Sequence, residues 1–60
     1  MTDFTNKLLE MESEKCKAFR MFNKMALELG EITHEQYLDE EKKIMMESVE
    51  NMKSIISKNK

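Results

Sequence analysis

The sequence predicts an all-α fold, an antiparallel two-helix hairpin that dimerises into a four-helix bundle. Three observations lead to this prediction. The 60 residues contain no proline and one glycine, so the chain is interrupted at a single point. On both sides of Gly30 the residues are good helix formers, rich in Glu, Lys, Met, Leu and Ala. In both halves apolar residues recur at spacings of three and four, as they do along one face of an α-helix.

The interruption is a short turn whose residues match helix stop and start signals. Gly30 suits the left-handed residue that closes a helix. Thr33 suits an N-cap, and Gln36 three positions later completes a capping box. A connection this short makes the two helices antiparallel neighbours. We therefore expect a single domain over 1–60, with a helix at 3–29, a turn at 30–33 and a helix at 34–57.

Apolar residues form one row on the 3–29 helix and two rows on the 34–57 helix. The first helix carries Phe4, Leu8, Met11, Ala18, Phe22, Met25 and Leu29 at heptad spacing, interrupted once by Lys15. The second helix carries Leu38, Met45, Val49, Met52 and Ile56 in one row. A further row, about a quarter-turn round, consists of Tyr37, Ile44 and Ile55.

Two apolar rows on one helix indicate two neighbours. A lone helix pair buries apolar surface along one face only, which falls short of offsetting the conformational entropy lost on folding. We therefore expect a homodimer, or a hairpin that folds fully only on a partner. The sequence leaves parallel and antiparallel packing of the hairpins open, and also dimer and tetramer. The expected dimer interface is Tyr37, Leu38, Ile44, Met45, Val49, Met52, Ile55 and Ile56.

The residues capable of chemistry do not form a catalytic or metal-binding set. His34 and Cys16 have no third orienting residue and no oxyanion donor beside them. The acidic run 39–41 is followed by Lys42 and Lys43, and carboxylates near a helix start are favourable against its dipole. Bundle metal sites use Glu-x-x-His within one helix, and the match in this sequence, Glu31 to His34, falls across the predicted turn. We predict no enzyme activity, no cofactor and no metal.

A basic stripe of Lys17, Arg20 and Lys24 lies on the 3–29 helix, opposite its apolar row. Such a line suits contacts with phosphates. However, Glu14 and Glu28 lie at the spacing of intrahelical ion pairs with Lys17 and Lys24, and the net charge of the chain is −2. Nucleic-acid binding is therefore an alternative that ranks below protein binding.

Several apolar side chains lie off the predicted rows, where a single hairpin would leave them exposed. These residues are Leu9, Cys16, Met21, Leu27 and Met46. Methionine adapts to irregular surfaces and is common at protein-binding faces. The predicted contacts with a larger protein are Leu9, Cys16, Met21, Leu27, Lys17, Arg20 and Lys24.

Neither a membrane segment nor a targeting segment is evident in the sequence. No run approaches the roughly 18 apolar residues of a membrane-spanning helix. The start of the chain has neither the basic nor the apolar stretch of a signal peptide, and one cysteine cannot build a disulfide framework. We expect a cytoplasmic protein with no membrane partner.

The residues around the turn follow a pattern of glycine, an aliphatic residue two positions on, threonine, an acidic residue, an aromatic residue, and lysine before two aliphatic residues. Here these places are held by Gly30, Ile32, Thr33, Glu35, Tyr37, Lys43, Ile44 and Met45. This segment resembles the SHOCT (short C-terminal) helical motif. The resemblance implies association through helices.

In size and architecture the chain is also similar to the small two-helix dimers that plasmids and phages use as regulators, such as the Rop family of RNA-binding repressors. Its Lys, Glu, Asn, Ile and Met bias is typical of an AT-rich genome. We predict a small protein-interaction module, a regulator or inhibitor that binds a larger host protein. The alternatives are a Rop-like nucleic-acid-binding dimer and a purely structural oligomerisation module.

Overall fold

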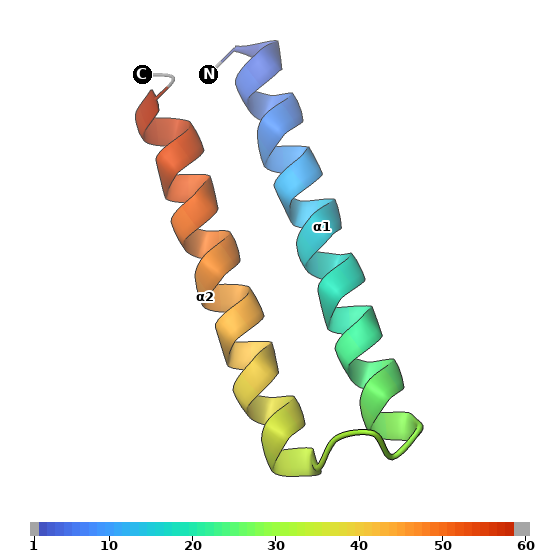
Figure 1. The fold of residues 1–60 in the computed structure, drawn as a ribbon. Helices are drawn as coiled ribbons and strands as arrows, with labels where there is room; N and C mark the ends of the chain where they lie inside the picture. The colour runs from blue at the N-terminus through green and yellow to red at the C-terminus, as the bar shows by residue number, and fades with distance from the viewer. Residues whose placement is uncertain (1, 59–60) are drawn as a thin grey trace.

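The computed structural model describes residues 2–58 and confirms the all-α antiparallel hairpin (Figure 1). Helix α1 spans Asp3–Glu28 and helix α2 spans His34–Lys58. Each helix therefore ends one residue away from the end predicted from the sequence. Residues 1, 59 and 60 of the predicted domain lie outside the described residues.

The end of α1 is closed by a glycine in the left-handed conformation. Gly30 has a φ of 76°. Its N–H donates to the carbonyl of Leu27 at 3.1 Å, and the N–H of Glu31 donates to the carbonyl of Ala26 at 2.9 Å. These two bonds form a Schellman motif, which satisfies carbonyls that the helix end would otherwise leave without partners.

Both helices begin at a threonine cap. The Thr2 hydroxyl accepts a hydrogen bond from the Thr5 N–H at 3.1 Å. At the start of α2 the Thr33 hydroxyl accepts from the Gln36 N–H at 3.1 Å, and the Gln36 side-chain oxygen accepts from the Thr33 N–H at 2.9 Å. This reciprocal pair is the predicted capping box. This capping box fixes the residue at which α2 begins, and therefore the position from which α2 runs back along α1.

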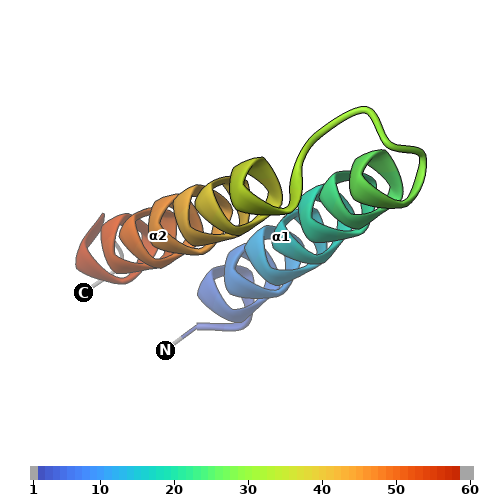
Figure 2. The ribbon, with the colours of Figure 1, turned by 90° about the horizontal axis from the view of Figure 1, so that it is seen from below.

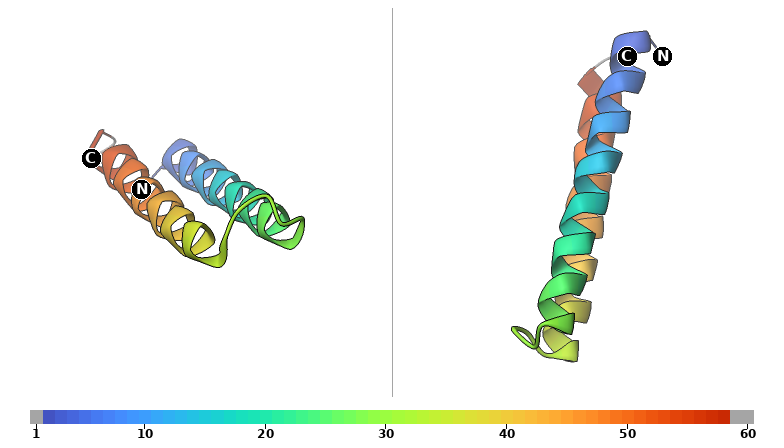
Figure 3. Two further views of the ribbon diagram at one scale, coloured as in Figure 1. Left: turned by 60° about the horizontal axis from the view of Figure 1, so that its bottom comes forward. Right: turned by 90° about the vertical axis from the view of Figure 1, so that its right-hand side faces the viewer.

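The hairpin is a single layer of two helices. Viewed from below, the turn bridges the two helices at one end (Figure 2). Viewed from the side, α1 lies in front of α2 (Figure 3, right). The Cα trace measures 43 × 15 × 9 Å. Within residues 2–58 no further element covers either face, so a side chain that does not point at the other helix lies on the surface.

The side chains between the helices, here called the interhelix seam, are largely polar. Its members are Thr5, Leu9, Glu12, Cys16 and Asn23 of α1, with Tyr37, Glu41, Ile44, Ser48 and Ile55 of α2. The buried side chains among residues 2–58 are Thr5, Glu12, Asn23 and Ser48, and none of the apolar ones is buried to the same degree. The apolar members of the seam are half-buried. The interior of the hairpin is therefore not a hydrophobic core.

Helix α1 is rotated by about a quarter-turn from the orientation that its apolar row indicates. The sequence predicts that Leu9, Cys16 and Leu27 are exposed, but they are half-buried, whereas Phe22 and Met25 of the main row are exposed. The physical reason for this rotation is the polar pairing between the helices. Side chains one position away from the main row make hydrogen bonds across the seam, and they reach α2 only when their own row faces it.

Candidate interaction surfaces

One face of the hairpin carries the exposed apolar row of α1. We call this row the α1 stripe; it comprises Phe4, Leu8, Met11, Lys15, Ala18, Phe22, Met25 and Leu29. All of these residues except the half-buried Leu8 are exposed. The stripe borders α2 along one side: Phe22 lines a shallow hollow with Glu40 and Glu47 of α2, and Leu8 lines another with Ile55.

A second apolar row runs along α2. We call it the α2 stripe; it comprises Leu38, Met45, Val49, Met52 and Ile56. Met52 is half-buried and the other four are exposed. Met45 and Val49 line a shallow hollow with Met46 and Glu50, to which α1 contributes nothing.

The two stripes lie on opposite faces of the hairpin. On α2, Glu47 is two residues away from both Met45 and Val49, which corresponds to about 200° around the helix. Because Phe22 of the α1 stripe shares its hollow with Glu47, the α1 stripe lies on the face that the α2 stripe turns away from. No single partner surface can cover both stripes from one side.

The basic stripe lies on the same face as the α2 stripe. Arg20 is two residues from both Ala18 and Phe22 of the α1 stripe, again about 200° around the helix. Its guanidinium Nε donates to Oε2 of Glu41 at 2.9 Å, so it forms an ion pair that links the two helices. Lys17 forms the predicted intrahelical pair with Glu14, at 3.9 Å.

The third member of the basic stripe differs from the other two. Within residues 2–58, the predicted ion pair between Lys24 and Glu28 is not present. Lys24 is exposed, and therefore carries the charge of the stripe that is most available to a partner.

Glu12 is a buried carboxylate in the middle of the seam. It is 8% exposed, its Oε1 lies 3.0 Å from the Lys15 ammonium, and its Oε2 accepts from the Asn51 amide at 3.4 Å. Burial alone would raise the pKa of this carboxyl, but hydrogen bonds from Lys15 and Asn51 and the charge of Lys15 together hold it below its ordinary value. The carboxylate is therefore favoured in its charged form, as a fixed part of the seam.

A second polar contact fixes the rotation of the helices nearer the turn. The Asn23 side-chain amide donates to the backbone carbonyl of Tyr37 at 3.0 Å. Asn23 is buried, so a rotation of α1 that removed this contact would leave an amide without its partner.

The residues capable of chemistry are not brought together. Cys16 is a free, half-buried cysteine, and about 18 Å of helix separates it from the end of α1. His34 is exposed beyond that end, with its ring centroid 6.1 Å from that of Tyr37. Among residues 2–58, no group of histidine, cysteine and acidic side chains is arranged to hold a metal ion. In the same range neither helix is long and apolar enough to cross a membrane.

The predicted dimer-interface residues divide between two environments. Tyr37, Ile44 and Ile55 are half-buried members of the seam. Leu38, Met45, Val49, Met52 and Ile56 belong to the α2 stripe, where Met52 is half-buried and the other four are exposed. The two rows of α2 therefore do face different directions, as expected, and α1 occupies one of them.

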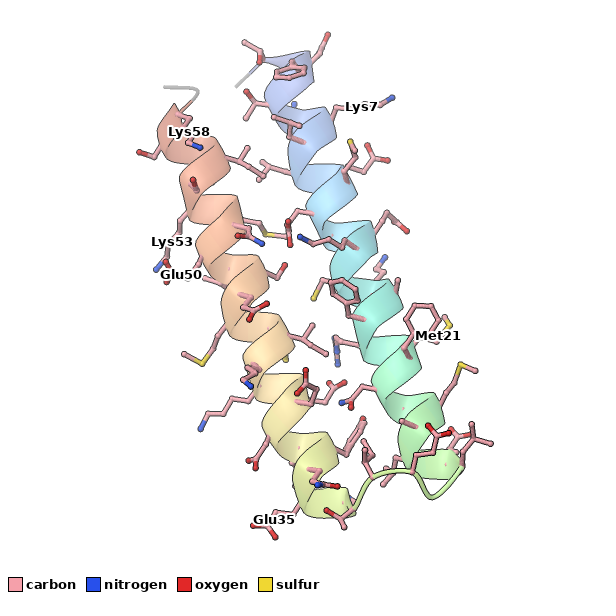
Figure 4. The ribbon with its side chains drawn as sticks, viewed as in Figure 1. Lys7, Met21, Glu35, Glu50, Lys53 and Lys58 are labelled. Atoms are coloured by element: carbon pink, nitrogen blue, oxygen red, sulfur yellow. The ribbon has the colours of Figure 1, made fainter. Side chains whose placement is uncertain are left out.

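The outer edges of the helices carry further exposed side chains. Met21, a predicted partner contact, points away from α2, as Lys7 does (Figure 4). The α1 stripe was not among the residues predicted to bind a partner. The polar residues Thr5, Glu12 and Asn23, which recur at heptad-compatible spacing beside it, are the signal that marks the neighbouring row as the seam.

The chain matches no family model, no curated protein and no solved structure. The resemblance to the SHOCT motif and the similarity to Rop-like dimers therefore stay predictions. The features of this chain that bear on its function are the two stripes and the charges beside them.

Proposed function

We propose that the chain is a protein-interaction module that works as a homodimer and binds a larger protein, as a regulator or inhibitor. One observation carries this proposal. Polar side chains are buried between the helices, while two apolar stripes are exposed on opposite outer faces. Contiguous exposed apolar surface marks sites of interaction in soluble proteins. The hairpin cannot cover either stripe itself, because each helix already uses its other row to contact its neighbour.

The face that carries the α2 stripe is the one we assign to the larger protein. This face combines adaptable methionines with the basic stripe of α1, including the exposed Lys24. A helix that packs on such a face is held by its apolar residues and selected by the charges along the edge of the face. The expected target surface is an apolar helix or ridge flanked by carboxylates. Binding there would act stoichiometrically, by covering the target surface or by stabilising one of its states.

Nucleic-acid binding by the basic stripe is the alternative, and the ion pairs of the stripe argue against it. Arg20 is held by Glu41, and Lys17 lies beside Glu14. Phosphates would have to compete with these carboxylates. The adjacent α2 stripe is apolar, and a phosphate backbone is contacted by basic and polar groups rather than by apolar surface.

The test is affinity capture from an extract of the cells that encode the protein, at low and high salt, with three baits. These are the unaltered chain, Val49→Glu and Arg20→Glu. We expect one stoichiometric protein that survives high salt and is lost with Val49→Glu. Phosphate contacts weaken steeply with salt. If the captured material is nucleic acid, is released by salt, and is lost with Arg20→Glu but not with Val49→Glu, the alternative replaces our proposal.

The homodimer is tested separately, by light scattering coupled to size exclusion over a dilution series, with helicity followed by circular dichroism. We expect a mass of twice 7.2 kDa and high helicity. A chain that is monomeric and poorly helical would overturn the homodimer. The stripes would then be surfaces that fold against the target.

A further inference from the structure

We propose that the α1 stripe is the homodimer interface and that two copies of α1 pack antiparallel, with Lys15 of one copy over the partner's Ala18. This inference rests on the proposed function, which supplies the homodimer, and it names the surface and register of that dimer. The occupant of the α1 stripe is thus a second copy of this chain. The α2 stripe stays free for the larger protein.

The spacing of the α1 stripe reads the same from both ends. Its eight positions are separated by four, three, four, three, four, three and four residues. A two-fold axis between residues 15 and 18 therefore brings every member of one stripe onto a member of the other, as in an antiparallel coiled coil. The pairs are Phe4 with the partner's Leu29, Leu8 with the partner's Met25, Met11 with the partner's Phe22, and Lys15 with the partner's Ala18.

Lys15 selects this register. A single lysine in an apolar seam specifies register and oligomeric state, at some cost in stability. In the proposed register it faces the partner's Ala18, the smallest side chain of the stripe, and its ammonium already has Glu12 of its own helix at 3.0 Å. A shift by one heptad in either direction would place Lys15 against the partner's Met11 or Met25. Such a shift would also leave one end of each stripe uncovered.

The outer edge of α1 carries charges that complement each other in this arrangement. Lys7 and Glu28 are both exposed, and Figure 4 shows Lys7 on the edge that points away from α2. In the antiparallel register Lys7 lies beside the partner's Glu28, and the symmetry repeats this pair at the other end. Met21, on the same edge (Figure 4), comes beside the methylene groups of the partner's Glu14.

The exposed apolar area favours the α1 stripe over the α2 stripe as the dimer interface. If each large residue is given about 200 Å², the value for an aromatic side chain, the exposed fractions of the five large residues of the α1 stripe correspond to roughly 600 Å² per copy. Those of the four exposed residues of the α2 stripe correspond to roughly 400 Å² on the same scale. Stable interfaces bury at least about 1,200 Å² in total. Two α1 stripes therefore bring more apolar area to such an interface than two α2 stripes do.

The α2 stripe can also be paired with itself, and the comparison shows why the α1 stripe is preferred. An antiparallel copy would place Leu38 on the partner's Ile56, and Asp39 would complement the partner's Lys53. However, Lys42 would then lie on the partner's Met52. Within residues 2–58 no carboxylate lies at ion-pair distance from the Lys42 ammonium. Burying an ammonium without a partner is costly.

The register is tested by cross-linking mixed chains, in a Cys16→Ser background, with a short bismaleimide. One chain carries Leu8→Cys and the other Met25→Cys. We expect a covalent dimer from the mixture and none from either chain alone, because residues 8 of the two copies lie about 25 Å apart in this register, as do residues 25. Leu38→Cys mixed with Ile56→Cys is the matched control on the α2 stripe, for which we expect no covalent dimer. Light scattering on each variant shows that the dimer is intact.

Four outcomes would overturn the inference. Linkage of the Leu38 and Ile56 chains alone would assign the interface to α2, where the sequence places it. Linkage within single-variant samples would indicate parallel packing. A dimeric mass with no linkage in either mixture would exclude this register while leaving the homodimer and the target capture untouched. A monomeric mass would overturn the homodimer of the proposed function as well.

Discussion

The interhelix seam is polar and the two stripes on the outside are apolar, which is the reverse of the arrangement in an ordinary helical protein. The seam buries Thr5, Glu12, Asn23 and Ser48, whereas the stripes expose phenylalanine, methionine, leucine, isoleucine and valine. Hydrogen bonds give little net stability but strongly disfavour arrangements that leave them unmade. Apolar burial supplies most of the driving force for folding and association. The seam therefore fixes how the two helices face each other. Burial of the stripes is what can drive association.

The division predicts two classes of variant. Substitutions in a stripe should change association and leave the hairpin geometry in place. Substitutions in the seam should destabilise the fold and affect association only through it. The four predictions below test this division, beginning with the largest expected effect.

The largest effect is expected from a charge placed in the α1 stripe. Phe22 is 62% exposed in the hairpin and is proposed to be covered in the dimer. Phe22→Glu would bury two carboxylates per dimer by symmetry, and we expect dimerisation to weaken by roughly 100-fold or more. Light scattering should then report a mass of 7.2 kDa at concentrations where the unaltered chain is dimeric.

Val49→Glu is the matched control, because Val49 holds the equivalent place on the α2 stripe and is also exposed. It should retain the dimeric mass and lose the captured protein. If Val49→Glu dissociates the dimer and Phe22→Glu does not, the roles of the two stripes are exchanged.

A smaller effect is expected from the seam contact near the turn. Asn23→Ala removes the hydrogen bond to the Tyr37 carbonyl, and we expect a loss of about 1 kcal/mol in the free energy of unfolding. Urea unfolding at a fixed protein concentration measures it. Asn6→Ala is the control, since Asn6 is exposed on the same helix and reports the gain in helix propensity alone. Equal unfolding midpoints for the two variants would show that the Asn23 contact does not hold the seam.

The pH dependence of stability tests the other seam contact. The pKa of Glu12 lies below its ordinary value of 4.5 because hydrogen bonds and the Lys15 charge outweigh its burial. A lowered pKa in the fold means that Glu12 contributes stability above pH 4.5, and that this contribution is lost as the pH falls through the lowered pKa. Glu12→Gln should therefore flatten the acid side of a plot of unfolding midpoint against pH. Glu14→Gln, on the exposed surface, should keep the steeper acid side, and identical profiles for the two variants would contradict the role of Glu12.

The sequence was sufficient to predict the two helices and the turn of the hairpin, because the signals for them are local. Gly30, Thr33 and Gln36 act within one turn of chain, and the observed Schellman motif and capping box depend on nothing further away. The rotation of α1 was not predictable in the same way. Two neighbouring rows of α1 share heptad spacing, and the choice between them depends on hydrogen bonds between residues 14 to 39 positions apart. Apolar content favoured the row that the structure leaves exposed, because apolar spacing carries no information on the polar pairing between the helices.

The smallest expected effect tests the register through the edge charges. Lys7→Glu would place two carboxylates side by side at each end of the dimer, and we expect dimerisation to weaken by about three- to fivefold, because exposed pairs contribute only a few tenths of a kcal/mol each. Glu28→Lys added to Lys7→Glu restores opposite charges and should recover the original affinity at low salt. The effect should shrink as salt is raised, since both side chains are exposed. If the double variant dimerises no better than Lys7→Glu alone, residues 7 and 28 are not neighbours across the interface, and the antiparallel α1 register is wrong even if the α1 stripe is buried.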